Sequence, residues 1–156
     1  VIQPTAKHLL LGTHGRSIYK ADIAPLQGLT SEVASKSVHI FEIENIRKSN
    51  NWGSSWSPWR APNLPKVTIP FYLNTSKKVT IAIFDGDLKV HSMSADADKG
   101  FNEVVYDVSF SDKGRKSYQK VNKEVTLSEA KNGVYYLPKG TYTVHIEEAS
   151  SMFEVK

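Results

Sequence analysis

The sequence predicts a mainly β protein, an antiparallel β-sandwich with one or two short helices. In residues 79–84 every second side chain is a branched aliphatic one, the period of a strand with one buried face. An Asp-Gly-Asp turn follows at 85–87, and Leu88 and Val90 resume the alternation, so a hairpin is predicted. The composition, 40% hydrophobic and 23% charged residues, is that of a globular domain able to bury a core.

Composition and charge exclude several classes of function. No apolar run approaches the roughly 18 residues that a membrane span needs, and a net charge of +4 is too mild to predict a nucleic-acid partner. The chain has no cysteine, which excludes disulfides and thiolate metal ligands. Because the sequence starts at Val1 rather than Met, we expect it to be a piece of a longer protein.

The N-terminal residues predict a small hairpin. Residues 8–11, with three consecutive leucines, predict one strand, Gly12 and Gly15 allow a tight turn, and residues 17–19 predict the second strand. His14 and Arg16 lie in this turn without a partner at a catalytic spacing, so we assign them to turn geometry and packing.

A short helix and another strand follow. Thr30 is suited to cap a helix of about two turns, with Glu32 in its first turn. The apolar residues between Val38 and Ile46 predict a strand, after which the composition changes sharply.

The loop 47–66 has the most functional promise, because it holds all three tryptophans among proline, serine and asparagine residues. Indole faces beside polar side chains are what sugar-binding surfaces use, since a pyranose ring stacks on the indole. The candidate carbohydrate-binding residues are Asn51, Trp52, Trp56, Trp59 and Arg60. The alternative, which we favour, is that the tryptophans pin the loop to the sandwich or to a neighbouring domain, because a long loop without apolar anchors would not stay ordered.

The C-terminal half predicts further strands and one helix. Pro70 lacks an amide donor, which predicts an edge strand or a bulge at residues 67–73. Ser111 can cap a helix with Tyr118 and Val121 on its apolar face, and its lysines are expected to be solvated. Residues 152–155 are expected to form the last edge strand.

Catalytic and metal-binding motifs are missing. The five histidines have no spacing typical of metal ligands, and no serine-nucleophile or phosphate-binding motif is present. Glu42 and Glu44 share one strand face rather than flanking a cleft, and Asp96 and Asp98 predict a solvated turn rather than a calcium loop. We therefore expect no catalytic residue, no metal site and no cofactor in this chain.

Residues 11–19, Leu-Gly-Thr-His-Gly-Arg-Ser-Ile-Tyr, resemble the closing strand pair of large β-propellers built from BNR-type repeats, which include sialidase-like proteins. The Asp-box of these repeats is absent, and one partial blade cannot close a propeller. The resemblance implies that residues 1–27 are the remnant of a last blade and that any active site lies upstream of Val1.

Two further motifs resemble FlgD-type immunoglobulin-like modules. Gly100, Asn102, Val104, Tyr106 and Asp107 fit one motif of these modules, and the Gly-x-Tyr-x-Val-x-Ile run at 140–146 fits their last strand. The resemblance implies an immunoglobulin-like β-sandwich over residues 64–156, preceded at 28–63 by the short helix, the strand and the tryptophan loop. Such modules are accessory domains of secreted bacterial proteins.

Three functions are consistent with these observations. The first is a non-catalytic C-terminal accessory domain of a secreted, periplasmic or cell-surface bacterial protein, with the upstream propeller of the same chain as its partner. The second is a carbohydrate-binding module that uses the tryptophan loop and has a glycan as its partner. The third is a part of a glycoside hydrolase whose active site lies upstream.

Overall fold

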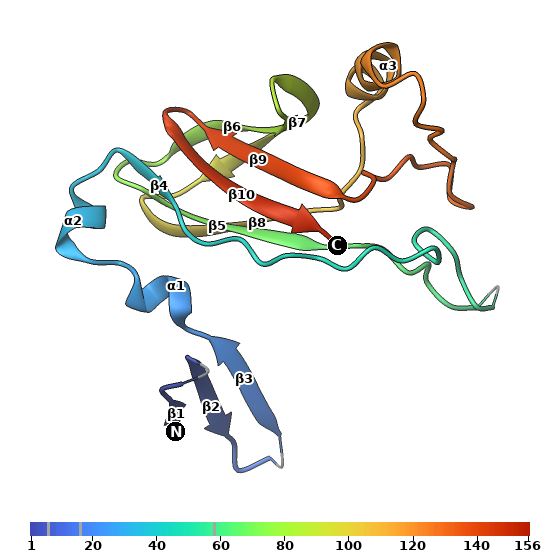
Figure 1. Cartoon of the computed structure of the whole chain (residues 1–156). Helices are drawn as coiled ribbons and strands as arrows, with labels where there is room; N and C mark the ends of the chain where they lie inside the picture. The colour runs from blue at the N-terminus through green and yellow to red at the C-terminus, as the bar shows by residue number, and fades with distance from the viewer. Residues whose placement is uncertain (6, 16, 58) are drawn as a thin grey trace.

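The computed structural model describes residues 1–5, 7–15, 17–57 and 59–156, and it is mainly β, as the sequence predicts. Two antiparallel sheets form a sandwich, and a third, N-terminal sheet stands apart from it (Figure 1). The ten strands of the described residues are β1 Ile2–Gln3, β2 His8–Gly12, β3 Ile18–Asp22, β4 Val38–Ile40, β5 Val67–Leu73, β6 Lys77–Asp85, β7 Leu88–Ala97, β8 Gly100–Tyr106, β9 Gly140–Ile146 and β10 Ala149–Val155.

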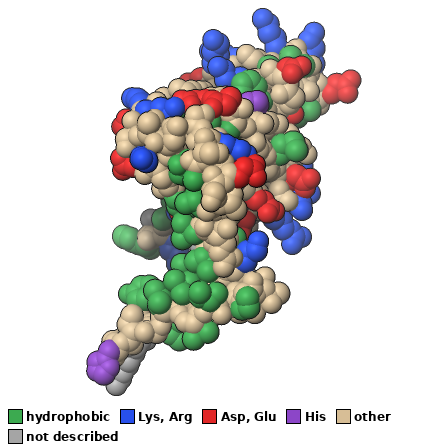
Figure 2. All heavy atoms as spheres, turned by 90° about the vertical axis from the view of Figure 1, so that its left-hand side faces the viewer, with side chains coloured by type: hydrophobic (Ala, Val, Ile, Leu, Met, Phe, Trp, Pro, Cys, Tyr) green, Lys and Arg blue, Asp and Glu red, His purple; other side chains and the backbone are tan. Residues whose placement is uncertain are grey.

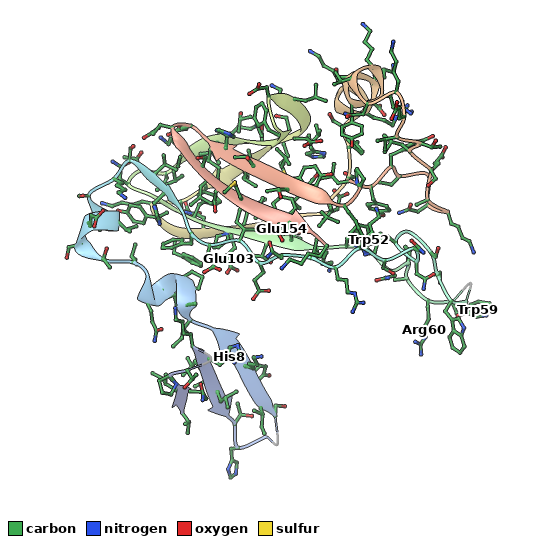
Figure 3. The ribbon with its side chains drawn as sticks, viewed as in Figure 1. His8, Trp52, Trp59, Arg60, Glu103 and Glu154 are labelled. Atoms are coloured by element: carbon green, nitrogen blue, oxygen red, sulfur yellow. The ribbon has the colours of Figure 1, made fainter. Side chains whose placement is uncertain are left out.

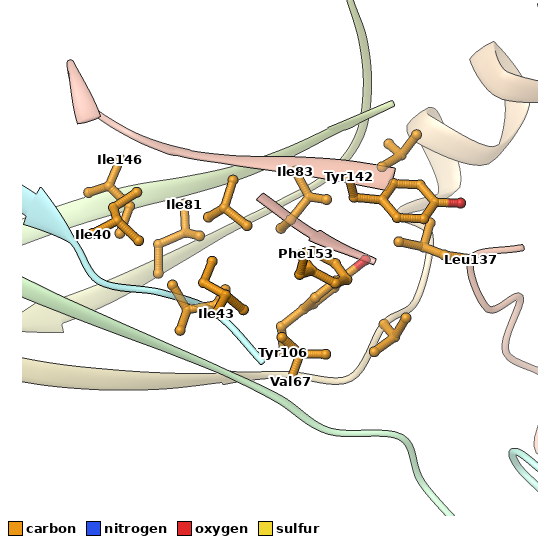
Figure 4. Close-up of a cluster of buried hydrophobic side chains, with 14 of the residues drawn as sticks. Ile40, Ile43, Val67, Ile81, Ile83, Tyr106, Leu137, Tyr142, Ile146 and Phe153 are labelled. Carbon is orange, nitrogen blue, oxygen red and sulfur yellow. The ribbon is translucent and has the colours of Figure 1, made fainter. Parts of the chain in front are cut away.

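The core lies between the two sandwich sheets, whose strand orders are β10-β9-β6-β7 and β4-β5-β8. Both sheets contribute aliphatic side chains from alternate strand positions, and a group of aromatic rings closes one end (Figure 4). Tyr106 donates a hydrogen bond to the Ser109 carbonyl at 2.5 Å, and Tyr142 donates one to the Pro138 carbonyl at 2.9 Å. These bonds satisfy the hydroxyl groups that the buried rings bring into the core.

The predicted hairpin is confirmed as β6 and β7. The two strands pair from Lys77 opposite Ala97 to Asp85 opposite Leu88, with an irregularity between Ile83 and Phe84. Gly86 occupies the turn with a φ of 56°, a left-handed conformation that glycine adopts at little cost. This hairpin supplies one half of the four-stranded sheet.

The prediction of an edge strand or bulge at Pro70 is wrong, because β5 is the central strand of its sheet. The ladder to the preceding segment nevertheless ends at this proline. Phe41 donates its amide to the Pro70 carbonyl at 3.0 Å, but the proline has no amide to return. The Phe41 carbonyl accepts instead from the Ser151 hydroxyl at 3.3 Å.

The strand predicted between Val38 and Ile46 is shorter than expected, since β4 ends at Ile40. Residues 41–45 are irregular, and Ile46 then forms an isolated parallel bridge with Val155. The loss of pairing at Pro70 explains why the strand stops there. The chain then leaves one sheet and runs along β10 of the other.

Two short helices, α1 (Ala24–Gln27) and α2 (Ser31–Ala34), connect the N-terminal sheet to the sandwich. Thr30 caps α2 as predicted, its hydroxyl accepting from the Val33 amide at 3.3 Å. Helix α1 was not expected, and it begins with a proline in its first turn, where proline is tolerated. A small second core of Val33, Phe41 and Tyr72 holds this connector on the sandwich.

Helix α3 (Asp112–Val121) packs on β7. Ser111 caps it as predicted, accepting from the Gly114 amide at 3.1 Å. Tyr118 is buried, but Val121 is 70% exposed, so the prediction that both form one apolar face is wrong for Val121. The last turn of the helix has already left the sheet at Val121.

The N-terminal sheet has the order β1-β2-β3 and confirms the predicted hairpin. The Thr13 amide donates to the Ser17 carbonyl at 3.0 Å and closes the turn, whereas Arg16 lies outside the described residues. Hydrophobic side chains gather over this part of the molecule (Figure 2). Among the described residues, no helix is long and apolar enough to cross a membrane.

Candidate functional site

The tryptophan loop connects β4 to β5 and has a closed base. The Gly53 amide donates to the Asn63 carbonyl at 2.8 Å, and the Asn63 amide donates to the Ser54 carbonyl at 2.8 Å. These two bonds join the two arms of the loop, so the residues between them form a tip that projects from the sandwich (Figure 3).

Trp52 anchors the loop to the body of the protein. Its side chain is only 6% exposed, and its ring lies edge-on to Tyr136, with 5.7 Å between the ring centroids. The Lys48 ammonium lies 4.5 Å from the Trp52 ring centroid and donates to the Leu137 carbonyl at 2.8 Å. Burial lowers the pKa of Lys48. The anchoring role favoured from the sequence is therefore observed for Trp52.

Gly53 lets the loop approach the neighbouring segment 125–138 closely. It has a φ of 74°, and a Cβ atom at this position would lie 2.3 Å from Asn132 Oδ1. Asn132 in turn donates from Nδ2 to the Tyr136 hydroxyl at 2.7 Å. A residue larger than glycine would push the two segments apart.

Trp56 and Trp59 have the opposite environment, with side chains 89% and 93% exposed. The Arg60 guanidinium lies 5.8 Å from the Trp56 ring centroid, and Figure 3 shows Trp59 and Arg60 at the tip of the loop. Asn51 is exposed beside the buried Trp52. The structure thus brings Trp56 and Arg60 together and separates both exposed indoles from Trp52.

A groove of about 410 Å³ runs between the first arm of the loop and residues 125–138. Its walls carry hydroxyl, amide and charged side chains, and Trp52 and Tyr136 also line it. The lining residues are Lys48, Ser49, Asn50, Trp52, Ser54, Val125, Thr126, Leu127, Ser128, Glu129, Ala130, Lys131, Tyr136 and Pro138. The sequence did not predict that residues 125–131 form a wall of this groove. Their composition indicates a polar turn, and no local pattern shows that they contact the tryptophan loop.

Groups with catalytic potential are dispersed. Glu42 and Glu44 are both exposed. Within the described residues, no group of three His, Cys, Asp or Glu side chains is placed to hold a metal ion. Asp98 is held in a turn by Asn102, which accepts from its amide at 2.9 Å and donates to its carbonyl at 2.7 Å.

His91 is an internal residue rather than a candidate base. Its ring lies 4.9 Å from that of Tyr106, and its Nδ1 is buried without a hydrogen-bond partner among the described residues. Burial lowers the pKa of His91, although the charge of Asp107 and a hydrogen bond with the Ser109 backbone act in the opposite direction. The tryptophan loop and its groove are accordingly the best candidate site.

Comparison with known proteins identifies no relative. No family model matches the chain, and no curated protein and no solved structure matches it.

Proposed function

We propose that this chain is a non-catalytic accessory domain of a larger secreted protein, and that its N-terminal sheet packs against an upstream domain. The observation that carries the proposal is the N-terminal sheet itself. Among the residues of β1, β2 and β3 whose side chains the structure describes, none is buried. Even the large apolar side chains are open to solvent: Leu11, Ile18 and Tyr19 are 51%, 79% and 61% exposed.

A three-stranded sheet without a covered face is marginal in water. Burying one large aliphatic side chain contributes about 1.5 to 3 kcal/mol. The strand register places Ile2, Leu11 and Tyr19 on one face, so a partner that covers this face would stabilise the sheet substantially. The resemblance of residues 11–19 to the last strand pair of a propeller supports our proposal that this partner is an upstream propeller domain.

The connector between the sheet and the sandwich supports an orienting role. The Tyr72 hydroxyl donates to the Ala34 carbonyl at 3.1 Å, and Gly28 lies directly against the ring of Phe41. A connector fixed in this way would transmit the position of an upstream domain to the sandwich, which a flexible linker would not do.

Hydrogen exchange tests this proposal. In the chain of 156 residues, we expect the amides of β2 and β3 to exchange much faster than those of β6 and β9, because little holds the sheet closed. In a protein that also contains the preceding domain, the same amides should exchange slowly. Slow exchange of β2 and β3 in the chain alone, or equally fast exchange in the longer protein, would contradict the proposal.

The exposure of Trp56 and Trp59 supports a second function, carbohydrate binding by the tryptophan loop. Two indoles that contact almost nothing in their own chain offer flat apolar faces, on which a pyranose ring can stack. Serine and asparagine side chains nearby can bind its hydroxyl groups.

A polysaccharide-binding screen tests this second function. Wild-type protein should be retarded in a gel that contains the polysaccharide it recognises, and Trp56→Ala with Trp59→Ala should abolish the retardation. The melting temperature of that double variant should equal that of the wild type, because neither indole is buried. If the folded double variant still binds the polysaccharide, carbohydrate binding by the tryptophan loop is contradicted.

A further inference from the structure

Three depressions around the tryptophan loop share lining residues and therefore lie next to one another. A basic cleft of about 470 Å³ is lined by Arg47, Lys48, Asn50, Lys139 and Lys156. The groove described above also includes Lys48 and Asn50. It shares Lys131 with a shelf of about 440 Å³ lined by Gly53, Ser55, Trp56, Ser57, Pro62, Lys131 and Asn132. We call this cleft, groove and shelf the loop-end path.

Backbone pairing holds the cations of the cleft side by side. The Lys48 amide donates to the Lys156 carbonyl at 2.7 Å, which aligns the two segments that carry these lysines. Lys139 directly precedes Gly140, which pairs with Val155. The chain therefore brings basic residues from three separate segments to one place.

Most of this positive charge is not neutralised within the protein. The Lys156 ammonium lies 3.5 Å from a Glu154 carboxylate oxygen. In the part of the chain that the structure describes, no salt bridge joins Arg47 or Lys139 to an acidic side chain. Arg47 and Lys139 can therefore accept an anionic group without first breaking an ion pair.

The groove that follows carries the polar groups that sugar hydroxyls require. Asn50, Thr126 and Ser128 can each donate and accept hydrogen bonds, and the Glu129 carboxylate can accept them. At the far end, the exposed Trp56 indole offers a stacking face. Charged, hydroxyl-binding and stacking groups thus follow one another along the path.

We infer that the loop-end path binds an acidic polysaccharide. The carboxylate or sulfate groups of the polymer lie in the basic cleft and near Lys131, its hydroxyl groups bind the walls of the groove, and one ring stacks on Trp56. This inference rests on the carbohydrate-binding function proposed above and names the class of glycan. A path that joins several depressions suits a polymer better than a single small anion.

One feature of the groove favours a polysaccharide over a single-stranded nucleic acid. Nucleic-acid grooves combine cations with aromatic faces on which bases stack. Here Trp52 is buried and turned edge-on to Tyr136, so it offers no open face within the groove.

Affinity electrophoresis and calorimetry against a panel of acidic polymers test the inference. The panel contains polygalacturonate, alginate and chondroitin sulfate, and methyl-esterified pectin and desulfated chondroitin serve as neutral counterparts. We expect an acidic polymer to bind and its neutral counterpart to bind about tenfold or more weakly. Binding should also weaken as salt rises, because the screening length falls from about 10 Å at 0.1 M to about 3 Å at 1 M.

Paired variants locate the site. Arg47→Glu with Lys139→Glu should weaken binding of the acidic polymer about tenfold or more while the melting temperature stays close to that of the wild type. Lys113→Glu with Lys116→Glu, which places the same charge change on exposed positions of α3, should leave binding nearly unchanged after allowance for net charge.

Three other outcomes would overturn the inference, and each has a different consequence for the proposed carbohydrate binding. Equal binding of neutral and acidic polymers, abolished by Trp56→Ala, would keep carbohydrate binding and refute the acidic class. Tighter binding of a thymidine oligonucleotide would make the path a nucleic-acid site. Binding by none of the polymers would refute the inference and leave only other neutral glycans for the second function.

Discussion

The ring of Trp52 lies edge-on to the ring of Tyr136, with an interplanar angle of 66° and 5.7 Å between the ring centroids. This contact joins the tryptophan loop to a segment more than 80 positions later in the sequence. It fixes the groove between them and leaves the other two indoles of the loop exposed. The loop therefore has a buried anchor and an exposed tip, which should behave differently on substitution.

Trp52→Ala should lower the free energy of unfolding by about 3 to 5 kcal/mol, because it removes a large buried ring and leaves a cavity. Trp56→Ala and Trp59→Ala should each change it by less than about 0.5 kcal/mol, since their side chains are 89% and 93% exposed. Urea denaturation of the three variants measures these differences. Equal destabilisation by all three would show that the tip is packed like the anchor.

Gly114→Ala should detach helix α3 from β7. A Cβ atom on Gly114 would lie 1.9 Å from the Val90 carbonyl oxygen, and a backbone atom cannot turn aside as a side chain can. We expect a loss of about 1 to 3 kcal/mol of stability, although alanine favours helices more than glycine does. Lys113→Ala in the same helix is the control and should be nearly neutral. A stabilised Gly114→Ala variant would mean that α3 does not contact β7.

Tyr106→Phe should cost about 1 to 2 kcal/mol of stability. The Tyr106 hydroxyl donates to the Ser109 carbonyl at 2.5 Å within the core, and the change leaves that buried acceptor without this donor. Tyr19→Phe is a matched control, because Tyr19 is 61% exposed. Thermal melts of both variants check the difference, and similar melts would contradict the buried bond.

Stability should fall as the pH drops below about 6.5. The folded protein holds the pKa of His91 below its ordinary value of 6.5, chiefly through burial, and the pKa of His39 is lowered in the same direction. On acidification the unfolded chain therefore binds protons at a higher pH than the folded protein does. The stability that the two neutral histidines contribute is fully present above their ordinary pKa and is lost as the pH falls below it. His91→Phe should flatten the decline of the urea midpoint between about pH 7 and about pH 5.

A urea midpoint that rises on acidification over this range would contradict the lowered pKa of the half-buried His91. His145→Phe provides a control for the substitution itself, because His145 is exposed on β9.

Much of the sandwich could be predicted from the sequence because its signals are local. The alternation at 79–84, the turn around Gly86 and the caps at Thr30 and Ser111 each depend on a few neighbouring residues. Local patterns set which side chains face inward, and the core then follows from hydrophobic burial. The structure confirms all four features.

Other features could not be predicted because they depend on residues far apart in sequence. Pro70 was expected at a sheet edge, yet β5 is central and the proline only ends the pairing that involves Phe41. The groove depends on Trp52 meeting Tyr136, and the basic cleft depends on Lys48 pairing with Lys156. A single sequence carries no local signal for such contacts.

We propose that the sandwich folds by itself and that the N-terminal sheet serves a partner. Removal of residues 1–22 tests it most directly, since this deletes β1, β2 and β3 and keeps both connector helices. Calorimetry should give the shortened chain the same melting temperature as the whole chain, within about 2 °C. The shortened chain should also aggregate less, because it lacks the exposed apolar side chains of the sheet. A loss of several degrees would show that the sheet belongs to the sandwich and would contradict the claim.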